Sequence, residues 1–232
     1  ETSINIKLEG TSTQLVDYEV SSIFGYKTYA GEINNPGVSV GVGSAAKFER
    51  PIQIIKYLDN STLMFDEGSY QIKKIDSKGV VTNFLGKAYN GGSEEGNAND
   101  VRVNIGRSGQ MTADLSNGNI YWTTGGSQIW KYDASSNLVS RMYSHDNTIR
   151  GIAILNNEIY FSDYYRYTIN KIVIGGSDYS YEVIVGVDGS NNSYYGGSGI
   201  TQPFTDAINY YPSELIADPS RNKIYVNFYD DF

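Results

Sequence analysis

The apolar positions of this chain recur in short groups separated by polar turns, a pattern typical of β-strands rather than helices. Two successive groups, at residues 62–66 and 71–76, reappear with the same internal spacing at 119–123 and 128–133. A third pair lies at 158–163 and 169–172, and the first group has a fourth copy at 223–227. Turns rich in Gly, Asp, Ser and Asn join the two groups of each pair, so each pair predicts a β-hairpin, whose strands we name b and c.

A further apolar segment precedes each b strand, and another follows each c strand. The first, strand a, covers residues 53–55, 110–113, 151–154 and 214–217, and the second, strand d, covers 80–85, 138–142 and 181–185. The interval between copies, measured at Leu63, Ile120, Ile159 and Ile224, varies from 39 to 65 residues because the d-to-a connection varies in length. A repeated four-stranded antiparallel unit of this size predicts an all-β fold, a β-propeller with four blade units.

The two ends of the chain each resemble half a blade. Residues 3–8 resemble a c strand and residues 18–23 a d strand, whereas the fourth copy contains only strands a and b. We therefore divide this single propeller domain into strands c and d of a split blade (1–24), full blades at 25–86, 87–143 and 144–186, and strands a and b of the split blade (187–232). A closed four-bladed ring, a segment of a larger propeller with for example six blades, and self-association through the split blade all fit this division.

Two sequence motifs carry a family resemblance. The stretch from Tyr211 to Val226, with Pro212, Asp218 and Asn222, resembles an NHL repeat. The segments Ile120-Tyr121-Trp122-Thr123 and Ile159-Tyr160-Phe161-Ser162-Asp163 are similar to the YWTD repeats of receptor propellers. The resemblance covers nearly the whole chain and implies a propeller, but propellers host many unrelated activities, so it leaves the function open.

The long connections are expected to gather on one side of the ring. In a propeller the d-to-a and b-to-c connections open on one face, which we name the long-loop face. Its d-to-a connections are residues 25–51, 86–109, 144–150 and 186–212. Long loops are often functional, so we expect a ligand on this face. The anchors at Ala45-Ala46-Lys47-Phe48 and residues 202–207 instead favour packing of part of these loops over the blades.

Tyrosines on the long-loop face are the candidate binding residues. A tyrosine offers a large flat surface with a polar tip, which suits both sugars and protein partners. The b-to-c turn of the third full blade contains Tyr164, Tyr165, Arg166 and Tyr167, and the last d-to-a connection contains Tyr194 and Tyr195. We expect most of the other tyrosines to pack between blades.

Catalytic chemistry has weaker support in the sequence. The single histidine, His145, lies beside Asp146 without a serine nucleophile motif, and we expect it at the surface. One histidine cannot form the zinc site of the lyase-type NHL enzymes. Calcium needs only oxygen ligands, and propeller lactonases, which this fold resembles, hold calcium in the central channel. The candidate donors Glu67, Asp163 and Asn227 form no recognisable ligand series, so we assign no catalytic residue, metal ligand or cofactor.

The composition excludes several classes of partner and site. The formal charge of −8 argues against nucleic acid, because such binding depends on Lys and Arg displacing phosphate counterions. There is no cysteine, hence no disulfide or thiolate site, and no apolar run is long enough to cross a bilayer. Sequons at Asn60 and Asn191 are glycan acceptors if the protein is secreted.

These observations favour a non-enzymatic binding or scaffold propeller, extracellular or at the cell surface. We expect it to bind a protein or a glycan, or copies of itself, through the long-loop face. The alternative is a calcium-dependent hydrolase or lactonase with its metal in the central channel.

Overall fold

The computed structural model describes residues 4–6, 18–20, 28–98, 100–173, 180–186 and 211–229. These residues form antiparallel sheets together with the short 3₁₀ helices η1 (Gly43–Ala45) and η2 (Leu58–Asn60). No helix within these ranges has the length and apolar character needed to cross a membrane. The all-β prediction is confirmed.

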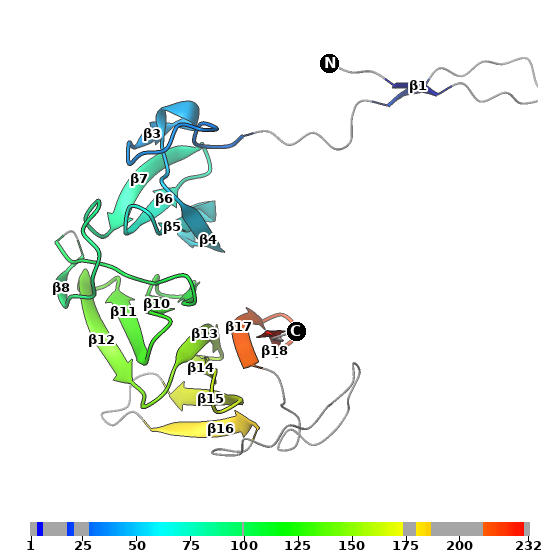
Figure 1. Cartoon of the computed structure of the whole chain (residues 1–232). Coiled ribbons are helices and arrows are strands. Elements are labelled where there is room, and N and C mark those ends of the chain that lie inside the picture. Colours follow the sequence, from blue (N-terminus) through cyan, green and yellow to red (C-terminus); the bar gives the residue numbers. More distant parts are fainter. Residues whose placement is uncertain are drawn as a thin grey trace, which may run out of the picture.

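Three full blades and one half-blade follow one another in the described part of the chain (Figure 1). Blade A contains β4 (Pro51–Lys56), β5 (Thr62–Asp66), β6 (Gln71–Ile75) and β7 (Val80–Leu85). Blade B contains β9 (Met111–Ala113), β10 (Ile120–Thr123), β11 (Gln128–Asp133) and β12 (Leu138–Ser144). Blade C contains β13 (Ile149–Leu155), β14 (Glu158–Asp163), β15 (Thr168–Val173) and β16 (Tyr181–Val185). Half-blade D contains β17 (Tyr211–Asp218) and β18 (Lys223–Tyr229).

The repeat in the sequence is also a repeat in strand register. In each full blade the pairing of strands c and d shifts by one residue near the start of strand c, between Ile72 and Lys73, Ile129 and Trp130, and Ile169 and Asn170. A bulge of this kind increases the local twist of the sheet. The blades therefore share one detailed backbone design.

The core lies between neighbouring blades. Because side chains alternate along a strand, each sheet can bury both of its faces. Leu63, Phe65 and Trp122 are buried in one cluster between blades A and B. The side chains of Tyr121 and Phe161 belong to a second cluster between blades B and C, and a third cluster joins blade C to half-blade D. The blades consequently stack face to face along an arc (Figure 1).

The first two long connections add strands that the sequence did not predict. β3 (Gly41–Val42) pairs with β7, and β8 (Gly96–Asn97) pairs with β12, so the sheets of blades A and B have five strands rather than four. These additions cover the outer edges of the two sheets. Ala46 is buried and Phe48 packs beside it, which confirms the packing role predicted for residues 45–48. Residues 202–207 lie outside the described part of the chain.

The predicted N-terminal strands pair with each other. β1 (Ile4–Ile6) and β2 (Tyr18–Val20) form an antiparallel sheet of their own, which lies apart from the blades in Figure 1. Their addition to half-blade D stays a prediction.

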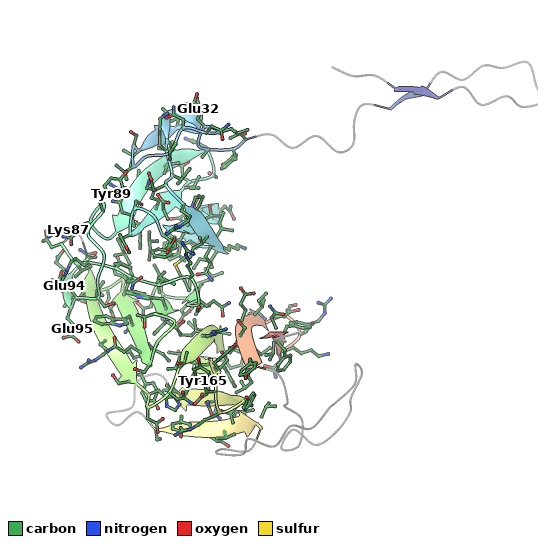
Figure 2. All side chains as sticks on the ribbon, viewed as in Figure 1. Glu32, Lys87, Tyr89, Glu94, Glu95 and Tyr165 are labelled. Carbon is green, nitrogen blue, oxygen red and sulfur yellow. The ribbon has the colours of Figure 1, made fainter. Side chains whose placement is uncertain are left out.

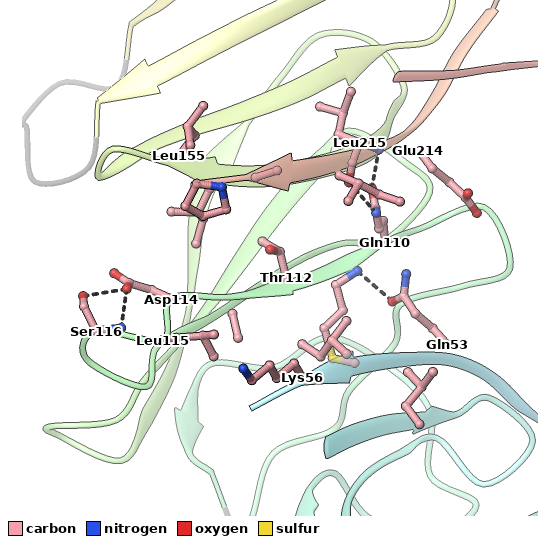
Figure 3. A pocket seen from close by; sticks show the side chains of 18 of the residues that line it. Gln53, Lys56, Gln110, Thr112, Asp114, Leu115, Ser116, Leu155, Glu214 and Leu215 are labelled. Atoms are coloured by element: carbon pink, nitrogen blue, oxygen red, sulfur yellow. Dashed lines mark hydrogen bonds between the residues drawn. The ribbon is translucent and has the colours of Figure 1, made fainter. Parts of the chain in front are cut away.

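Glutamine side chains connect the inner strands of successive blades. The Oε1 atom of Gln53 on β4 accepts a hydrogen bond of 2.7 Å from the backbone N–H of Met111. Oε1 of Gln110 accepts hydrogen bonds from the N–H groups of Ile152 (2.8 Å) and Leu215 (2.9 Å), and its Nε2 donates to the carbonyl of Leu215 (Figure 3). Gln110 thus fixes β17 beside β13.

A glycine makes this approach of β17 possible. A Cβ atom at Gly151 on β13 would lie 2.1 Å from the carbonyl oxygen of Ser213, which is too close for any side chain. The inner strands β4, β9, β13 and β17 together line a cavity of about 800 Å³ (Figure 3).

Candidate functional site

The turn between β14 and β15 holds four of the predicted binding residues in one place. The backbone N–H of Arg166 donates to the carboxylate of Asp163 over 3.0 Å, and the N–H of Tyr164 donates to the carbonyl of Thr148. Tyr167 closes the turn with a left-handed backbone (φ 59°). A Cβ atom at Gly186 would lie 2.5 Å from the carbonyl of Tyr167, so the turn also depends on a glycine after β16. The local sequence therefore fixes where these side chains point.

Tyr164 is the buried centre of the site. Its ring stacks on that of Tyr211, the first residue of β17, with 4.5 Å between ring centroids. The guanidinium carbon of Arg150 lies 3.3 Å from the centroid of the same ring. Because the guanidinium and the second ring cannot share one face of Tyr164 at these distances, the ring of Tyr164 lies between Arg150 and Tyr211. This stack joins blade C to half-blade D.

Tyr165 and Tyr167 complete a group that we name the tyrosine cluster: Tyr164, Tyr165, Tyr167 and Tyr211. Tyr165 is 55% exposed, and its ring stands nearly perpendicular to those of Tyr164 and Tyr211. The ring centroid of Tyr167 lies 5.0 Å from that of Tyr211. A hydrogen bond with Tyr211, together with burial, raises the pKa of Tyr167 to about 12. This phenol is neutral at physiological pH, and the cluster presents an aromatic surface with polar tips.

Arg166 stabilises the turn itself. Its guanidinium forms two hydrogen bonds to the carboxylate of Asp146, at 2.8 and 2.6 Å, and lies 3.4 Å from the hydroxyl of Tyr181. Such bidentate pairs fix geometry well. The same ion pair lowers the pKa of Asp146. The predicted binding residue Arg166 is therefore already engaged within its own blade.

His145 lies beneath this turn, and the expectation that it is a surface residue is wrong. The residue is 8% exposed, and its Nε2 atom lies 2.7 Å from the buried carboxylate of Asp163. The hydroxyl of Tyr143 lies 3.3 Å from its other ring nitrogen, and the rings of Phe161 and Tyr181 pack edge-on against it. Because the aromatic rings enclose it, His145 supports the turn from below.

Sequence reasoning missed two residues of the site, Tyr211 and Arg150. Both lie at the start of an a strand, where the d-to-a connection ends on the long-loop face, and that position is a signal that could have revealed them. Tyr194 and Tyr195, which were predicted to bind, lie outside the described residues.

Two of the three candidate calcium donors have other contacts. Glu67 pairs with Arg50 and Arg107, Asp163 contacts His145, and Asn227 is exposed on β18. Within the described ranges, no three His, Cys, Asp or Glu side chains form a group that could hold a metal ion. A calcium site in the central channel stays a prediction.

Comparisons with known proteins identify the fold. No family model and no curated protein matches the chain. A solved protein of unknown function from Bacteroides thetaiotaomicron is 16% identical over 87% of this chain and 44% of its own, with a TM-score of 0.51. A nidogen/laminin complex is 13% identical over 77% of this chain and 56% of the other, with a TM-score of 0.50. A streptogramin B lyase is 16% identical over 77% and 48%, with a TM-score of 0.48.

The chain is a β-propeller. It spans about half the length of the solved structures that it matches, at 44%, 48% and 56% of those chains. At these low identities the likeness shows the fold alone, and the NHL resemblance is not matched by a family model. Propellers host many unrelated activities, so the fold does not choose between an enzyme and a binding module.

Proposed function

We propose that this propeller is a non-enzymatic binding module that captures a protein or glycan partner through the tyrosine cluster. The observation that carries the proposal is the exposed ring of Tyr165, held edge-on by Tyr164 and Tyr211. An exposed aromatic side chain normally loses rotational freedom when it binds, and this ring is already oriented by its neighbours. Tyrosine and arginine are also the residue types that dominate binding interfaces.

The location of the cluster supports the same function. Its residues come from the b-to-c turn of blade C and the start of β17, both on the long-loop face. Asn60 lies in the connection between strands a and b of blade A, on the opposite face, and is exposed. A glycan at this sequon would leave the tyrosine cluster accessible, which fits an extracellular protein. The nidogen/laminin complex is an example of a propeller-like structure seen with a protein partner.

Binding by matched tyrosine variants tests the proposal. Wild-type protein, Tyr165→Ala and Tyr89→Ala are applied to arrays of glycans and of purified extracellular proteins. Tyr89 is a suitable control because it is 60% exposed and lies in the connection that follows blade A, far from Tyr165 (Figure 2). We expect a ligand that wild type and Tyr89→Ala bind alike and that Tyr165→Ala binds about tenfold more weakly or worse. Equal losses in the two variants, or the absence of any ligand, would contradict the proposal.

A further inference from the structure

Arg150 is a cation that stacks on an aromatic ring but forms no ion pair with a described residue. It lies in the bulge at the start of β13, between Ile149 and Ile152, and its carbonyl accepts a hydrogen bond of 2.6 Å from the hydroxyl of Thr123. Its side chain is half-buried against Tyr164. The Nε atom is buried and has no hydrogen-bond acceptor among the described residues. A buried donor of this kind is costly to leave unsatisfied, so it needs an explanation.

Several other half-buried cations of the described chain are neutralised by carboxylates, whereas Lys74 lies over the ring of Tyr57 without an ion pair to a described residue. Lys47 pairs with Glu32 at 2.9 Å, Lys131 with Asp133 at 2.6 Å, and Arg166 with Asp146 at 2.6 Å. Arg150 forms no ion pair with a described carboxylate, and its guanidinium carbon lies 3.3 Å from the centroid of the Tyr164 ring. Stacking on Tyr164 orients the guanidinium, and its remaining N–H groups form the planar fork that matches a carboxylate.

We propose that Arg150 is the anion subsite of the tyrosine cluster and that it binds the carboxylate of an acidic sugar residue in a glycan. This inference rests on the proposed binding function and names the ligand class of the same site. A single guanidinium in a protein with a net charge of −8 favours a singly charged carboxylate over a phosphate dianion.

The neighbouring rings favour a sugar over an acidic peptide. Tyr165 and Arg150 both contact Tyr164, at 5.0 and 3.3 Å from its centroid, so they lie within the reach of one sugar residue. A six-membered uronate carries its carboxylate and a flat C–H face in one rigid unit, which can contact the guanidinium and the exposed ring together. The flexible side chain of Asp or Glu would pair with Arg150 and leave the ring of Tyr165 uncovered.

The test measures binding of two tetrasaccharides by calorimetry. One alternates glucuronate with N-acetylglucosamine, and the other is the same molecule with its carboxylates reduced to alcohols. Wild type is compared with Arg150→Gln and with Arg141→Gln, a control that removes an exposed arginine from β12. We expect wild type and the control to bind the carboxylated form at least about tenfold more tightly than the reduced form. In Arg150→Gln the preference should disappear, whereas binding of the reduced form, which shows that the site is folded, should persist.

Other results overturn the inference in distinguishable ways. If wild type binds both tetrasaccharides equally in a Tyr165-dependent manner, the anion subsite is refuted and the binding function stands. If a glutamate-rich peptide binds through Arg150 and neither tetrasaccharide binds, the glycan class is refuted. If Arg141→Gln loses the preference as much as Arg150→Gln, the effect is one of net charge and the subsite is refuted. If neither Tyr165→Ala nor Arg150→Gln alters any binding, both proposals fail.

Discussion

The b-to-c turns of blades A and C, which we call corners, share a backbone conformation but differ in the side chains at their surface. Each corner contains a tyrosine in a left-handed conformation, Tyr70 with φ 56° and Tyr167 with φ 59°. In each, a glycine after strand d passes close to the carbonyl of that tyrosine. In blade A, the acidic group is neutralised within the fold, because the buried carboxylate of Asp66 lies 3.3 Å from Nζ of the buried Lys73.

The corner of blade C differs at its surface. Its buried carboxylate, Asp163, contacts His145, and its surface includes the exposed ring of Tyr165 and Arg150, which stacks on Tyr164 and forms no ion pair with a described residue. In blade A, charged side chains at the corresponding surface pair with one another, as Glu67 does with Arg50 and Arg107. The two corners thus share a backbone but differ in the side chains at their surface, and this difference supports the site proposed in blade C.

The largest effect is expected from removing the cation of the blade A corner. Lys73→Ala leaves Asp66 as a buried carboxylate without its counter-charge, which costs about 3 kcal/mol or more in the free energy of unfolding. Chemical denaturation measures this value. Lys78→Ala, at an exposed position, should change it by no more than about 0.5 kcal/mol. A similar small change for Lys73→Ala would mean that the pair does not stabilise the corner.

The shared backbone is tested by the two corner glycines. Gly86→Ala and Gly186→Ala each place a Cβ atom within 2.4 and 2.5 Å of a backbone carbonyl, at φ values of 89° and 91°. Each should destabilise the protein by about 2 kcal/mol or more in the same denaturation experiment. Gly126→Ala is the control, because a Cβ atom at this position would lie 3.3 Å from its nearest neighbour, the side-chain hydroxyl of Thr124. A large effect in only one corner would show that the two backbones are not equivalent.

The split blade is tested by deleting residues 1–24. β18 pairs with β17 along one edge, and the exposed Ile216 and Tyr225 lie opposite each other on one face of half-blade D. If residues 1–24 add strands to β18, their deletion should speed amide hydrogen exchange in Lys223–Tyr229 about tenfold or more, since an unpaired edge opens readily. Exchange in β5 of blade A serves as the reference. Identical exchange of β18 in the two chains would rule out the added strands.

The smallest effect concerns the ion pair that anchors the tyrosine turn. Arg166 lowers the pKa of Asp146 below its ordinary 3.8, so the contribution of the pair to stability is present above pH 3.8 and is lost as the pH falls through the lowered value. In Arg166→Gln, NMR titration of the Asp146 carboxyl should give a pKa close to 3.8. The pKa of Asp76, lowered chiefly by the backbone N–H of Val80, should not change. An unaltered pKa of Asp146 in Arg166→Gln would mean that Arg166 does not stabilise the turn through this ion pair.

The sequence predicted the blades well because each of their strands carries a periodic apolar pattern. It did not predict β3 and β8, since two residues are too few to show any period. His145 was placed at the surface because its buried partner Asp163 lies on another strand, and no local pattern connects the two residues. Tyr211 was missed for a similar reason, because its stacking on Tyr164 depends on the docking of β17 through Gln110 and Gly151.

The side chain of Gln110 has a consequence for folding. In most repeat proteins each unit contacts only its immediate neighbours, so units can unfold one after another from an end. Gln110 of blade B bonds to the backbone of blade C through Ile152 and to that of half-blade D through Leu215. Unfolding of half-blade D therefore removes a hydrogen-bond partner of Gln110, which lies two units away in blade B. We expect blades B and C and half-blade D to lose their structure in one cooperative transition.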